Sequence, residues 1–579
     1  MTREARDDRK AATVAKAQGP ANAAAPHFPP AHAFVVRLGP VGRGFLTLLL
    51  LLLIGLLSLA MLFPRSVTPA SAPPDQFSGE RAMAHLPTIA REPHPARSPA
   101  QERVRDYLVE QLSAIPLEVE VQRTAGVENV VARLRGTDPT GAIVVLAHYD
   151  SVRAGPGAGD NGSGVAALLE IIRALAAGPT PHNDVIALFD DSEEYGPFAG
   201  TRAFVREHPW MPDVRVAISL DTAVAGPIST NETGPNNGWL VQALARAYTG
   251  GAWTSISGGG GYDYAPFRDA GVQGLALEDN YPFKEKHTAQ DLPELVSAAS
   301  VNQMGRQTLA IVRELADLDI SSPWGTQETW FPVPVLGLVH YPENWSLPLA
   351  ITSSLMLVLA LALALRRRLV SWRGLGVALG AILTTTLISA VGIGLLWSRM
   401  PDLLSWDTSQ WPDWPEVIPP YGWLIFAASG FLVLVLVLIF YTQARRWSAP
   451  ADFSLSGLLP FLVFAVTLAV GIPRAAYAPV WIVLIGSLGW IVLGATGGTR
   501  RRGSADLAIV LAAVPILTLF LPLLPGVFMG DGTKSVAILA GAWVLLLGVA
   551  LPAVDALLVR PPKESAHILS PDPATAQGD

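Results

Sequence analysis

The segment VVLAHYDSVRAGPGAGDNGSG, residues 144–164, and the segment VIALFDDSEE, residues 185–194, decide the fold of this chain. Each begins with a short continuous apolar run, which is typical of a strand buried on both faces of a sheet. The first run ends in His148 and the second leads to Glu193 and Glu194. Because the carboxyl ends of parallel strands meet at one edge of a sheet, we expect these side chains to lie together. Imidazole and carboxylates gathered there predict a zinc site with a general base.

The residues around these two segments alternate between strand and helix patterns. Candidate strands are 117–122, 129–134, 143–147, 185–189, 214–220, 253–257 and 274–277. Helical patterns lie at about 98–114, 162–177, 197–208, 237–250 and 293–318. The predicted fold class is α/β, with a mostly parallel mixed sheet flanked by helices on both faces. Asp221 closes one of the strands and His287 lies in a loop before the last helix, so both are further candidates for the site.

The composition limits what the chain can bind. Half of the 579 residues are hydrophobic, only 15% are charged, and the net charge is −7. No basic stretch alternates with aromatic residues, so nucleic acid is not an expected partner. The chain has no cysteine. Disulfides and thiolate zinc sites are therefore excluded, and any metal must be held by His, Asp or Glu.

Hydropathy divides the chain into segments of different character. The apolar run 44–63 is about 20 residues long, enough to span a bilayer, although a signal peptide cleaved near Ser71-Ala72 is the competing interpretation. Residues 66–320 have an ordinary globular composition, and the chain becomes hydrophobic again after residue 346. The predicted segments are a disordered cytoplasmic tail (1–43), a transmembrane anchor (44–63), a globular domain that carries the candidate zinc site (66–320), an all-α transmembrane bundle of about seven helices (346–559) and a cytoplasmic tail (560–579).

The positions of the arginines predict the orientation in the membrane. Arginine clusters at 366–368, 445–446 and 500–502 follow every second candidate span, whereas the intervening loops are acidic. The positive-inside rule then places both termini in the cytoplasm and residues 66–345 on the other side. A re-entrant segment at 455–472 would change the count of spans but not the side of the globular domain. The Ala-, Arg- and Pro-rich composition suits a bacterium, so we expect an inner or plasma membrane and an extracytoplasmic domain.

Each candidate residue also has an ordinary structural explanation. A single histidine at a strand end is more often hydrogen-bonded than metal-bound, and an Asp-Asn-Gly-Ser-Gly run is by default a turn followed by a helix cap. A Glu-Glu pair at a strand end is usually solvated. Their joint occurrence at strand ends, in one order along the chain, favours a site.

Taken together, these residues resemble the co-catalytic dizinc aminopeptidase family. That family includes glutamate carboxypeptidases and the membrane metallopeptidases of the vacuole and the endoplasmic reticulum. The matching motifs are His148-Tyr149-Asp150-Ser151, Asp160-Asn161-Gly162-Ser163-Gly164, Glu193-Glu194 with Gly200, Asp221, Tyr262-Asp263-Tyr264-Ala265-Pro266-Phe267, and His287-Thr288 with Asp291.

The resemblance implies a role for each residue. Asp160 would bridge two Zn²⁺ ions, with His148 and Asp221 completing one ligand set and Glu194 and His287 the other. Glu193 would be the general base, and Asp150 would hold the His148 ring as its hydrogen-bond partner. Tyr262 and Asp263 are the candidates for substrate binding.

Three positions depart from the family pattern. Ser192 stands where relatives often have glycine, and Lys286 stands where an aromatic residue is common, so it could alter the mouth of the pocket. The glycine run 258–261 is also unusual. None of these departures removes an implied metal ligand, so they bear on substrate preference more than on catalysis.

The expected function is that of a membrane-bound zinc exopeptidase of the aminopeptidase type. Peptides are the expected substrates, and a water molecule activated by two zinc ions is the expected nucleophile. The alternatives are a one-zinc glutaminyl cyclase-like enzyme, a catalytically inactive receptor-like domain, and a transporter with an appended peptidase domain. Intramembrane ionisable residues would favour the transporter, but Arg474, Asp506 and Asp555 all lie near predicted span ends.

Overall fold

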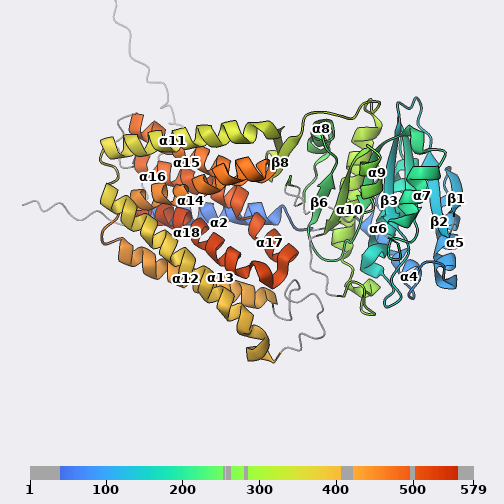
Figure 1. Ribbon diagram of the computed structural model, residues 1–579, viewed down its shortest axis with the longest axis horizontal. Helices are drawn as coiled ribbons and strands as arrows, with labels where there is room; N and C mark the ends of the chain where they lie inside the picture. Colours follow the sequence, from blue (N-terminus) through green and yellow to red (C-terminus); the bar gives the residue numbers. More distant parts are fainter. Residues whose placement is uncertain are drawn as a thin grey trace, which may run out of the picture.

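The computed structural model describes residues 40–64, 66–124, 126–196, 198–251, 254–255, 262–279, 285–405, 422–495 and 503–558. An α/β domain and a helical bundle lie end to end (Figure 1). The glycine run 258–261 and nearly all of the two predicted tails lie outside the described residues.

The α/β domain is built on a seven-stranded sheet with the strand order β1-β2-β4-β3-β5-β7-β6. Its strands are β1 (Glu118–Thr124), β2 (Val127–Leu134), β3 (Ala142–His148), β4 (Asp184–Asp190), β5 (Val214–Leu220), β6 (Ile228–Thr233) and β7 (Gln273–Asp279). The four central strands β4, β3, β5 and β7 are parallel, whereas β1, β2 and β6 join antiparallel at the two sides. The predicted α/β class with a mixed sheet is therefore confirmed.

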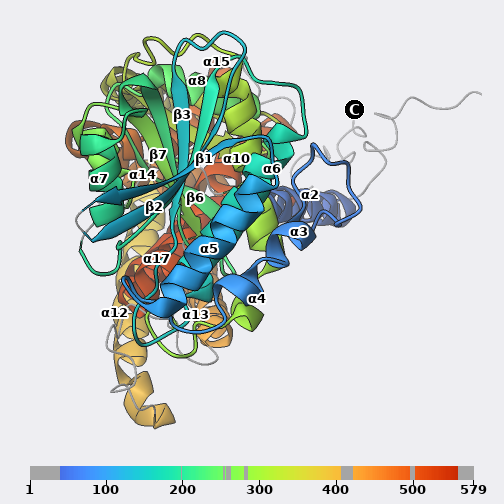
Figure 2. The ribbon, with the colours of Figure 1, turned by 90° about the vertical axis from the view of Figure 1, so that its right-hand side faces the viewer.

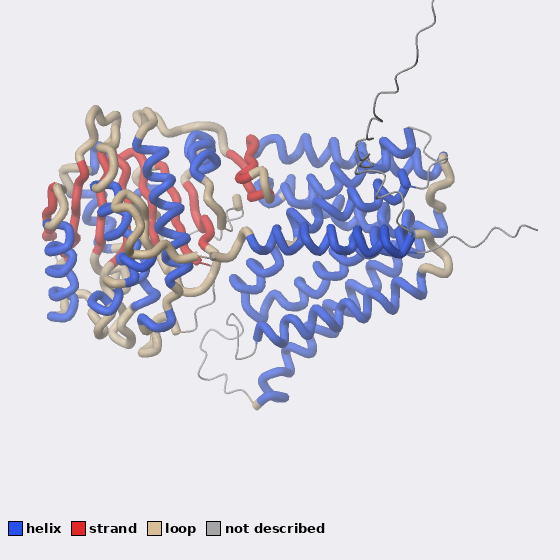
Figure 3. Tube along the Cα trace, turned by 180° about the vertical axis from the view of Figure 1, so that it is seen from behind, coloured by secondary structure: helices blue, strands red, loops and turns tan. Residues whose placement is uncertain are grey.

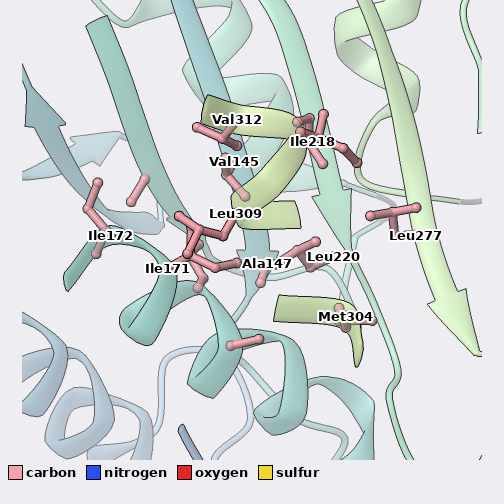
Figure 4. Packing of buried hydrophobic residues seen from close by; sticks show 14 of the residues in the cluster. Val145, Ala147, Ile171, Ile172, Ile218, Leu220, Leu277, Met304, Leu309 and Val312 are labelled. Carbon is pink, nitrogen blue, oxygen red and sulfur yellow. The ribbon is translucent and has the colours of Figure 1, made fainter. Parts of the chain in front are cut away.

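Helices cover both faces of the sheet. They are α3 (Gly79–Met83), α4 (Leu86–Ile89), α5 (Pro99–Ser113), α6 (Ser163–Ala176), α7 (Ala199–Glu207), α8 (Gly238–Ala247), α9 (Ala265–Asp269) and α10 (Ala298–Ala316). Figure 2 shows α7 on one side of the sheet and α5, α6 and α10 on the other. Alternate residues of β3 belong to the hydrophobic cores on the two faces of the sheet. Val145 and Ala147 pack under α6 and α10 (Figure 4), and Val144 packs on the other face. Because both faces are buried, the strand is apolar throughout.

Three observed strands were not predicted, and the predicted strand 253–257 lies mostly outside the described residues. Of the predicted strand 253–257, only Thr254 and Ser255 are described, and neither belongs to a strand. The missed strand β6 has the sequence ISTNET, which is largely polar because β6 is the edge strand of the sheet. Strands β8 (Glu328–Val333) and β9 (Gly337–Pro342) form a separate hairpin beyond the predicted end of the domain.

The bundle contains, within the described residues, seven helices that are long and apolar enough to cross a membrane. Its helices are α2 (Pro40–Ala60), α11 (Ser346–Arg366), α12 (Trp372–Leu404), α13 (Gly422–Ala444), α14 (Pro450–Gly471), α15 (Tyr477–Ala495), α16 (Gly503–Pro515), α17 (Leu523–Asp531) and α18 (Val536–Leu558). Helix α2 corresponds to the predicted anchor, and its apolar part Phe45–Ala60 is shorter than the seven others. Helix α14 runs through the segment for which a re-entrant loop was the alternative.

The hairpin β8–β9 lies at the junction of the two parts (Figure 3). Phe331 of β8 stacks on Tyr477 at the start of α15, with 4.3 Å between the ring centroids. In addition, the Ser255 hydroxyl donates to the carbonyl oxygen of Arg474 at 2.8 Å. The hairpin therefore packs the α/β domain against the end of the bundle.

Candidate metal centre

Two groups of possible metal ligands share one residue at the carboxyl edge of the sheet. His148, Asp160 and Asp221 form one group, and Asp160, Glu194 and His287 form the other. Within each group the ligand atoms all lie within 4.8 Å of one another. The structure thus brings together all five residues expected as ligands, with Asp160 common to both groups. Their assignment as zinc ligands stays a prediction.

The fold explains why residues so far apart in sequence meet. His148 is the last residue of β3, and Asp221 directly follows β5, which is hydrogen-bonded to β3. Glu194 follows β4, the neighbour of β3 on the other side. Asp160 lies in the loop before α6, and His287 lies in the segment 285–290 after β7. Parallel central strands therefore supply the scaffold, and two loops complete the site.

A close contact between these loops depends on Gly155. A Cβ atom at this position would lie 1.9 Å from the carbonyl oxygen of Thr288. Any larger residue would therefore push the loop after β3 away from the loop that carries His287.

Asp160 and His148 interact directly and are both buried. His148 Nε2 lies 3.3 Å from Asp160 Oδ1. Burial by itself would lower the pKa of His148, but the carboxylates of Asp150 and Asp160 raise this pKa well above its ordinary value. Burial opposes ionisation of Asp160, yet Lys286, His148 and His287 hold the pKa of this carboxyl well below its usual range. Asp160 is therefore a carboxylate surrounded by cationic or metal-binding groups.

His287 lies between the two acids of its group. Its Nε2 atom is 3.1 Å from Asp160 Oδ2 and 3.2 Å from Glu194 Oε1. These two carboxylates raise the pKa of His287 to about 10. Lys286, the departure from the family pattern, places Nζ 3.3 Å from the same Asp160 oxygen. Lys286 therefore lies at the mouth of the site and also offsets part of its negative charge.

The residues present fit a pair of divalent cations. Asp160 Oδ2 and Glu194 Oε1 are buried oxygens that have only the close contacts with His287 and Lys286 and accept no well-aligned hydrogen bond within the described residues. A buried carboxylate oxygen without a hydrogen bond is costly unless a cation satisfies it. Histidine and carboxylate ligands without cysteine suit zinc in a catalytic setting.

Asp150 orients three residues of the site. Its carboxylate accepts the backbone N–H of Glu193 at 3.0 Å and that of Glu194 at 3.3 Å. Asp150 Oδ1 also lies 3.6 Å from His148 Nδ1. One carboxylate therefore fixes the turn that carries both glutamates and faces the histidine ring, as expected of a supporting residue.

Glu193 lies beside the two ligand groups, and its role as general base stays a prediction. Burial raises the pKa of Glu193 to about 7, and the charges of Asp221 and Glu194 act in the same direction, whereas His148 opposes them. Divalent cations bound nearby would lower this pKa. A carboxylate that titrates near or below neutrality can accept a proton at physiological pH.

The two residues expected to bind substrate lie in different surroundings. The Tyr262 hydroxyl donates to Glu278 Oε1 at 2.6 Å. Asp263 is buried, and its Oδ1 lies 3.4 Å from the Thr201 hydroxyl, which also donates to Asp190 at 3.1 Å. Burial raises the pKa of Asp190 to about 7, and burial together with the nearby charge of Asp190 also raises the pKa of Asp263. The substrate-binding role of Tyr262 and Asp263 stays a prediction.

Two acids of this region received no role from the sequence. Asp291 accepts the backbone N–H of Gly159 at 2.6 Å and that of Asp160 at 3.2 Å, so it shapes the loop that carries the shared ligand. Glu278, in β7, faces Tyr262, and burial raises its pKa to about 8. Glu278 could have been found from the sequence, because the run LALED is another apolar strand with acids at its end.

The chain is similar in sequence to known peptidases. Residues 129–312 match the family model described as "Peptidase family M28". "Endoplasmic reticulum metallopeptidase 1" of Rattus norvegicus is 27% identical over 434 residues, which cover 64% of this chain and 45% of that protein. "Vacuolar membrane protease" of Candida albicans is 30% identical over 252 residues, or 40% of this chain and 30% of that protein. The chain thus spans less than half the length of these curated relatives.

Solved structures with some similarity include a zinc aminopeptidase and a cyclase. The Bacillus subtilis zinc aminopeptidase has a TM-score of 0.38 and 16% identity, over 42% of this chain and 96% of that chain. A Porphyromonas gingivalis glutaminyl cyclase has a TM-score of 0.36 and 20% identity, over 41% of this chain and 99% of that chain.

The family match begins within β2, ends within α10, and includes every residue of the candidate site. Residues 129–312 of the α/β part are therefore similar to the peptidase domain of family M28.

Proposed function

We propose that this chain is a membrane-bound, zinc-dependent exopeptidase of the aminopeptidase type, which removes N-terminal residues from peptides. The observation that carries the proposal is the pair of ligand groups sharing Asp160, with Glu193 directly before one ligand. The domain family and the metallopeptidase relatives support the reaction class. The helices that could cross a membrane support the membrane attachment.

The side chains of the site divide the work of hydrolysis. Two zinc ions, one held by His148 and Asp221, the other by Glu194 and His287, and both by Asp160, would supply Lewis acidity toward water and the peptide carbonyl. Glu193 takes a proton from the attacking water molecule while the oxygen of that water bonds to the carbonyl carbon of the peptide. Glu193 then gives that proton to the amine nitrogen as the C–N bond breaks, which balances the reaction. Asp150 keeps Glu193 and Glu194 in place through their backbone N–H groups.

Metal content and product analysis test this proposal together. We expect two zinc ions per purified chain and fewer in His287→Ala, because one ligand set then loses its imidazole. His182→Ala is the matched control, since His182 is a partly exposed histidine whose nearest acid is Asp138 at 3.8 Å. Peptides with a free amino terminus should be shortened from that end, and N-acetylated peptides should not. Two zinc ions in His287→Ala would refute the ligand assignment.

The same measurements separate the alternatives. One zinc ion with N-terminal glutamine converted to a ring would favour the glutaminyl cyclase-like enzyme. No metal and no turnover would favour the inactive receptor-like domain. Uptake of a solute by proteoliposomes would favour the transporter. We assign the bundle an anchoring or substrate-presenting role, because Arg474 and Asp555 lie near the ends of the described helices.

We further propose that the α/β domain faces the side of the membrane opposite to the cytoplasm. The domain lies at the end of the bundle where α11 begins, and Arg366–Arg368 follow the other end of this helix (Figure 1). The positive-inside rule places these arginines in the cytoplasm.

Because the chain has no cysteine, single introduced cysteines report topology cleanly. We expect Ser321→Cys, in the α/β domain, to react with an impermeant maleimide on intact cells, and Arg368→Cys to react only after lysis. The reverse pattern would invert the topology.

A further inference from the structure

A cleft of about 440 Å³ opens where α2 leaves the bundle and meets the α/β domain. It lies between the chain that follows α2, the first half of α10, the segment 248–250 and the tip of the β8–β9 hairpin. None of the candidate metal ligands lines this cleft.

One side of the cleft is apolar and continues the lipid-facing surface of α2. Ala60, Met61 and Phe63 form this side, and the last turns of α2 expose Leu56 and Leu57. Trp345, at the start of α11, is also exposed, and such aromatic residues are enriched at the interface between membrane and water. The cleft therefore opens at the level where the hydrocarbon region of a bilayer would end.

The hairpin tip points to the same interface. Val335 is 95% exposed and Leu336 is 73% exposed, although both are large apolar residues. Val335 also has a φ of 71°, so the turn presents it in a backbone conformation that β-branched residues rarely adopt. Since Phe331, on the same hairpin, stacks on Tyr477 at the start of α15, the tip cannot lie far from the membrane surface. Headgroups and acyl chains would cover these two side chains.

The polar side of the cleft keeps one cation free for a ligand. Asn302 donates to Ser66 O at 2.8 Å, and Gln303 donates to Leu62 O at 3.3 Å, so both hold the chain that follows α2. The Thr249 hydroxyl donates to Gln307 at 2.7 Å. Arg306, in contrast, is exposed and makes no ion pair within the described part of the chain. A guanidinium group is well suited to bind a phosphate through two parallel hydrogen bonds.

We propose that this cleft binds one anionic phospholipid of the surrounding bilayer. Arg306 binds the phosphate, the acyl chains follow the exposed leucine face of α2, and Val335 and Leu336 insert among the neighbouring headgroups. A phospholipid fits better than a soluble anion because the apolar side of the cleft is continuous with the lipid-facing helix. The inference depends on the membrane placement of the bundle and is independent of the peptidase reaction.

Native mass spectrometry of the full chain tests the proposal. We expect the detergent-solubilised protein to retain one added phosphatidylglycerol, and to retain phosphatidylcholine with the same acyl chains much less. Arg306→Gln should weaken phosphatidylglycerol binding roughly tenfold, the equivalent of one charge-assisted hydrogen bond. Arg202→Gln, which removes an exposed arginine of α7 outside the cleft, is the matched control and should bind as the natural chain does.

Three outcomes would overturn the proposal. The first is equal retention of phosphatidylglycerol by the Arg306→Gln variant, and the second is displacement of the lipid by millimolar inorganic phosphate. The third concerns the hairpin: the fluorescence of Val335→Trp should be quenched by lipids brominated near the headgroup, and unchanged fluorescence would place the tip in water. Zinc content and turnover should stay the same in all these variants, so failure here leaves the proposed function untouched.

Discussion

The α/β domain and the bundle bury their polar side chains in opposite ways. In the domain, buried carboxyl groups gather at one edge of the sheet, among them Asp150 and Asp160. In the described part of the bundle, most buried polar residues are serines and threonines, and several of their hydroxyls donate to carbonyls of their own helix. Ser353 donates to Ala350 at 2.9 Å, and Thr385 donates to Ala381 at 2.7 Å. Such hydroxyls satisfy themselves locally and need no ligand.

The charged groups show the same contrast. In the bundle, Arg445 Nε lies 2.5 Å from Asp555 Oδ2, and Tyr441 donates to that oxygen at 2.7 Å. In the domain, the five acids around the site, Asp150, Asp160, Glu193, Glu194 and Asp221, outnumber the nearby cations. A buried charge without a partner is costly, so compensated charge indicates a structural role and uncompensated charge indicates a place for a ligand. This distinction supports the proposal that the chemistry belongs to the domain and that the bundle anchors it.

The largest expected effect comes from Glu193→Gln. The amide keeps the shape of the side chain but cannot accept a proton, so we expect turnover to fall by roughly 10²- to 10⁴-fold. Zinc content and thermal stability should be unchanged, because Glu193 is not among the possible metal ligands. Steady-state rates on unblocked peptides, with metal analysis of the same sample, measure both expectations.

The matched control for this variant is Glu110→Gln, on the exposed side of α5. It makes the same chemical change away from the site and should keep full activity. Comparable turnover by Glu193→Gln and Glu110→Gln would remove Glu193 from the role of base.

Several of the candidate ligands follow strong local sequence patterns, which is why the sequence could predict that they lie together. His148 ends an apolar run and Asp221 ends another, so the sheet alone places them at one edge. His287 was a weaker candidate, because the segment around it belongs to no strand or helix, and its role as a ligand was implied only by the family resemblance. The support given by Asp291 to the Asp160 loop was not predictable, because a hydrogen bond across 131 residues has no local signature.

The sequence failed where pairing with a distant partner decides the structure. Strand β6 is a polar edge strand that exists because β7 offers an unpaired edge, and nothing in ISTNET itself demands it. The hairpin β8–β9 likewise gains its stability from packing on Tyr477, far along the chain. Tertiary contacts override local propensity at such places.

A smaller effect, on stability alone, is expected from Asp555→Asn. The variant removes the charge that Arg445 and Tyr441 share, which should cost about 1–3 kcal/mol, as for hydrogen bonds to a charged group. We therefore expect a lower unfolding temperature for the detergent-solubilised protein, with kcat/KM unchanged. A loss of turnover as large as that of Glu193→Gln would contradict the contrast between domain and bundle, because the bundle would then contribute to the chemistry.

The smallest expected effect is the pH dependence of stability that comes from His208, a buried histidine of the domain outside the candidate site. His208 stacks on Phe204 with 4.4 Å between ring centroids, and its Nδ1 accepts the backbone N–H of Trp210 at 3.2 Å. Burial lowers the pKa of His208 below its ordinary value of 6.5, although Glu120 opposes this. A folded-state pKa below the unfolded one means that the unfolded chain binds the proton more tightly. The stability from neutral His208 is therefore present above pH 6.5 and is lost as the pH falls toward the folded pKa.

We expect the unfolding temperature to drop between about pH 7.5 and pH 5.5, and part of this drop to disappear in His208→Gln. Thermal unfolding of the two proteins across that range isolates the contribution of this one residue, since the acids of the site titrate alike in both. An equal drop in the two proteins would mean that the acid sensitivity belongs to the metal centre. In that case the stability of the domain would depend on pH through the groups of the metal centre and not through His208.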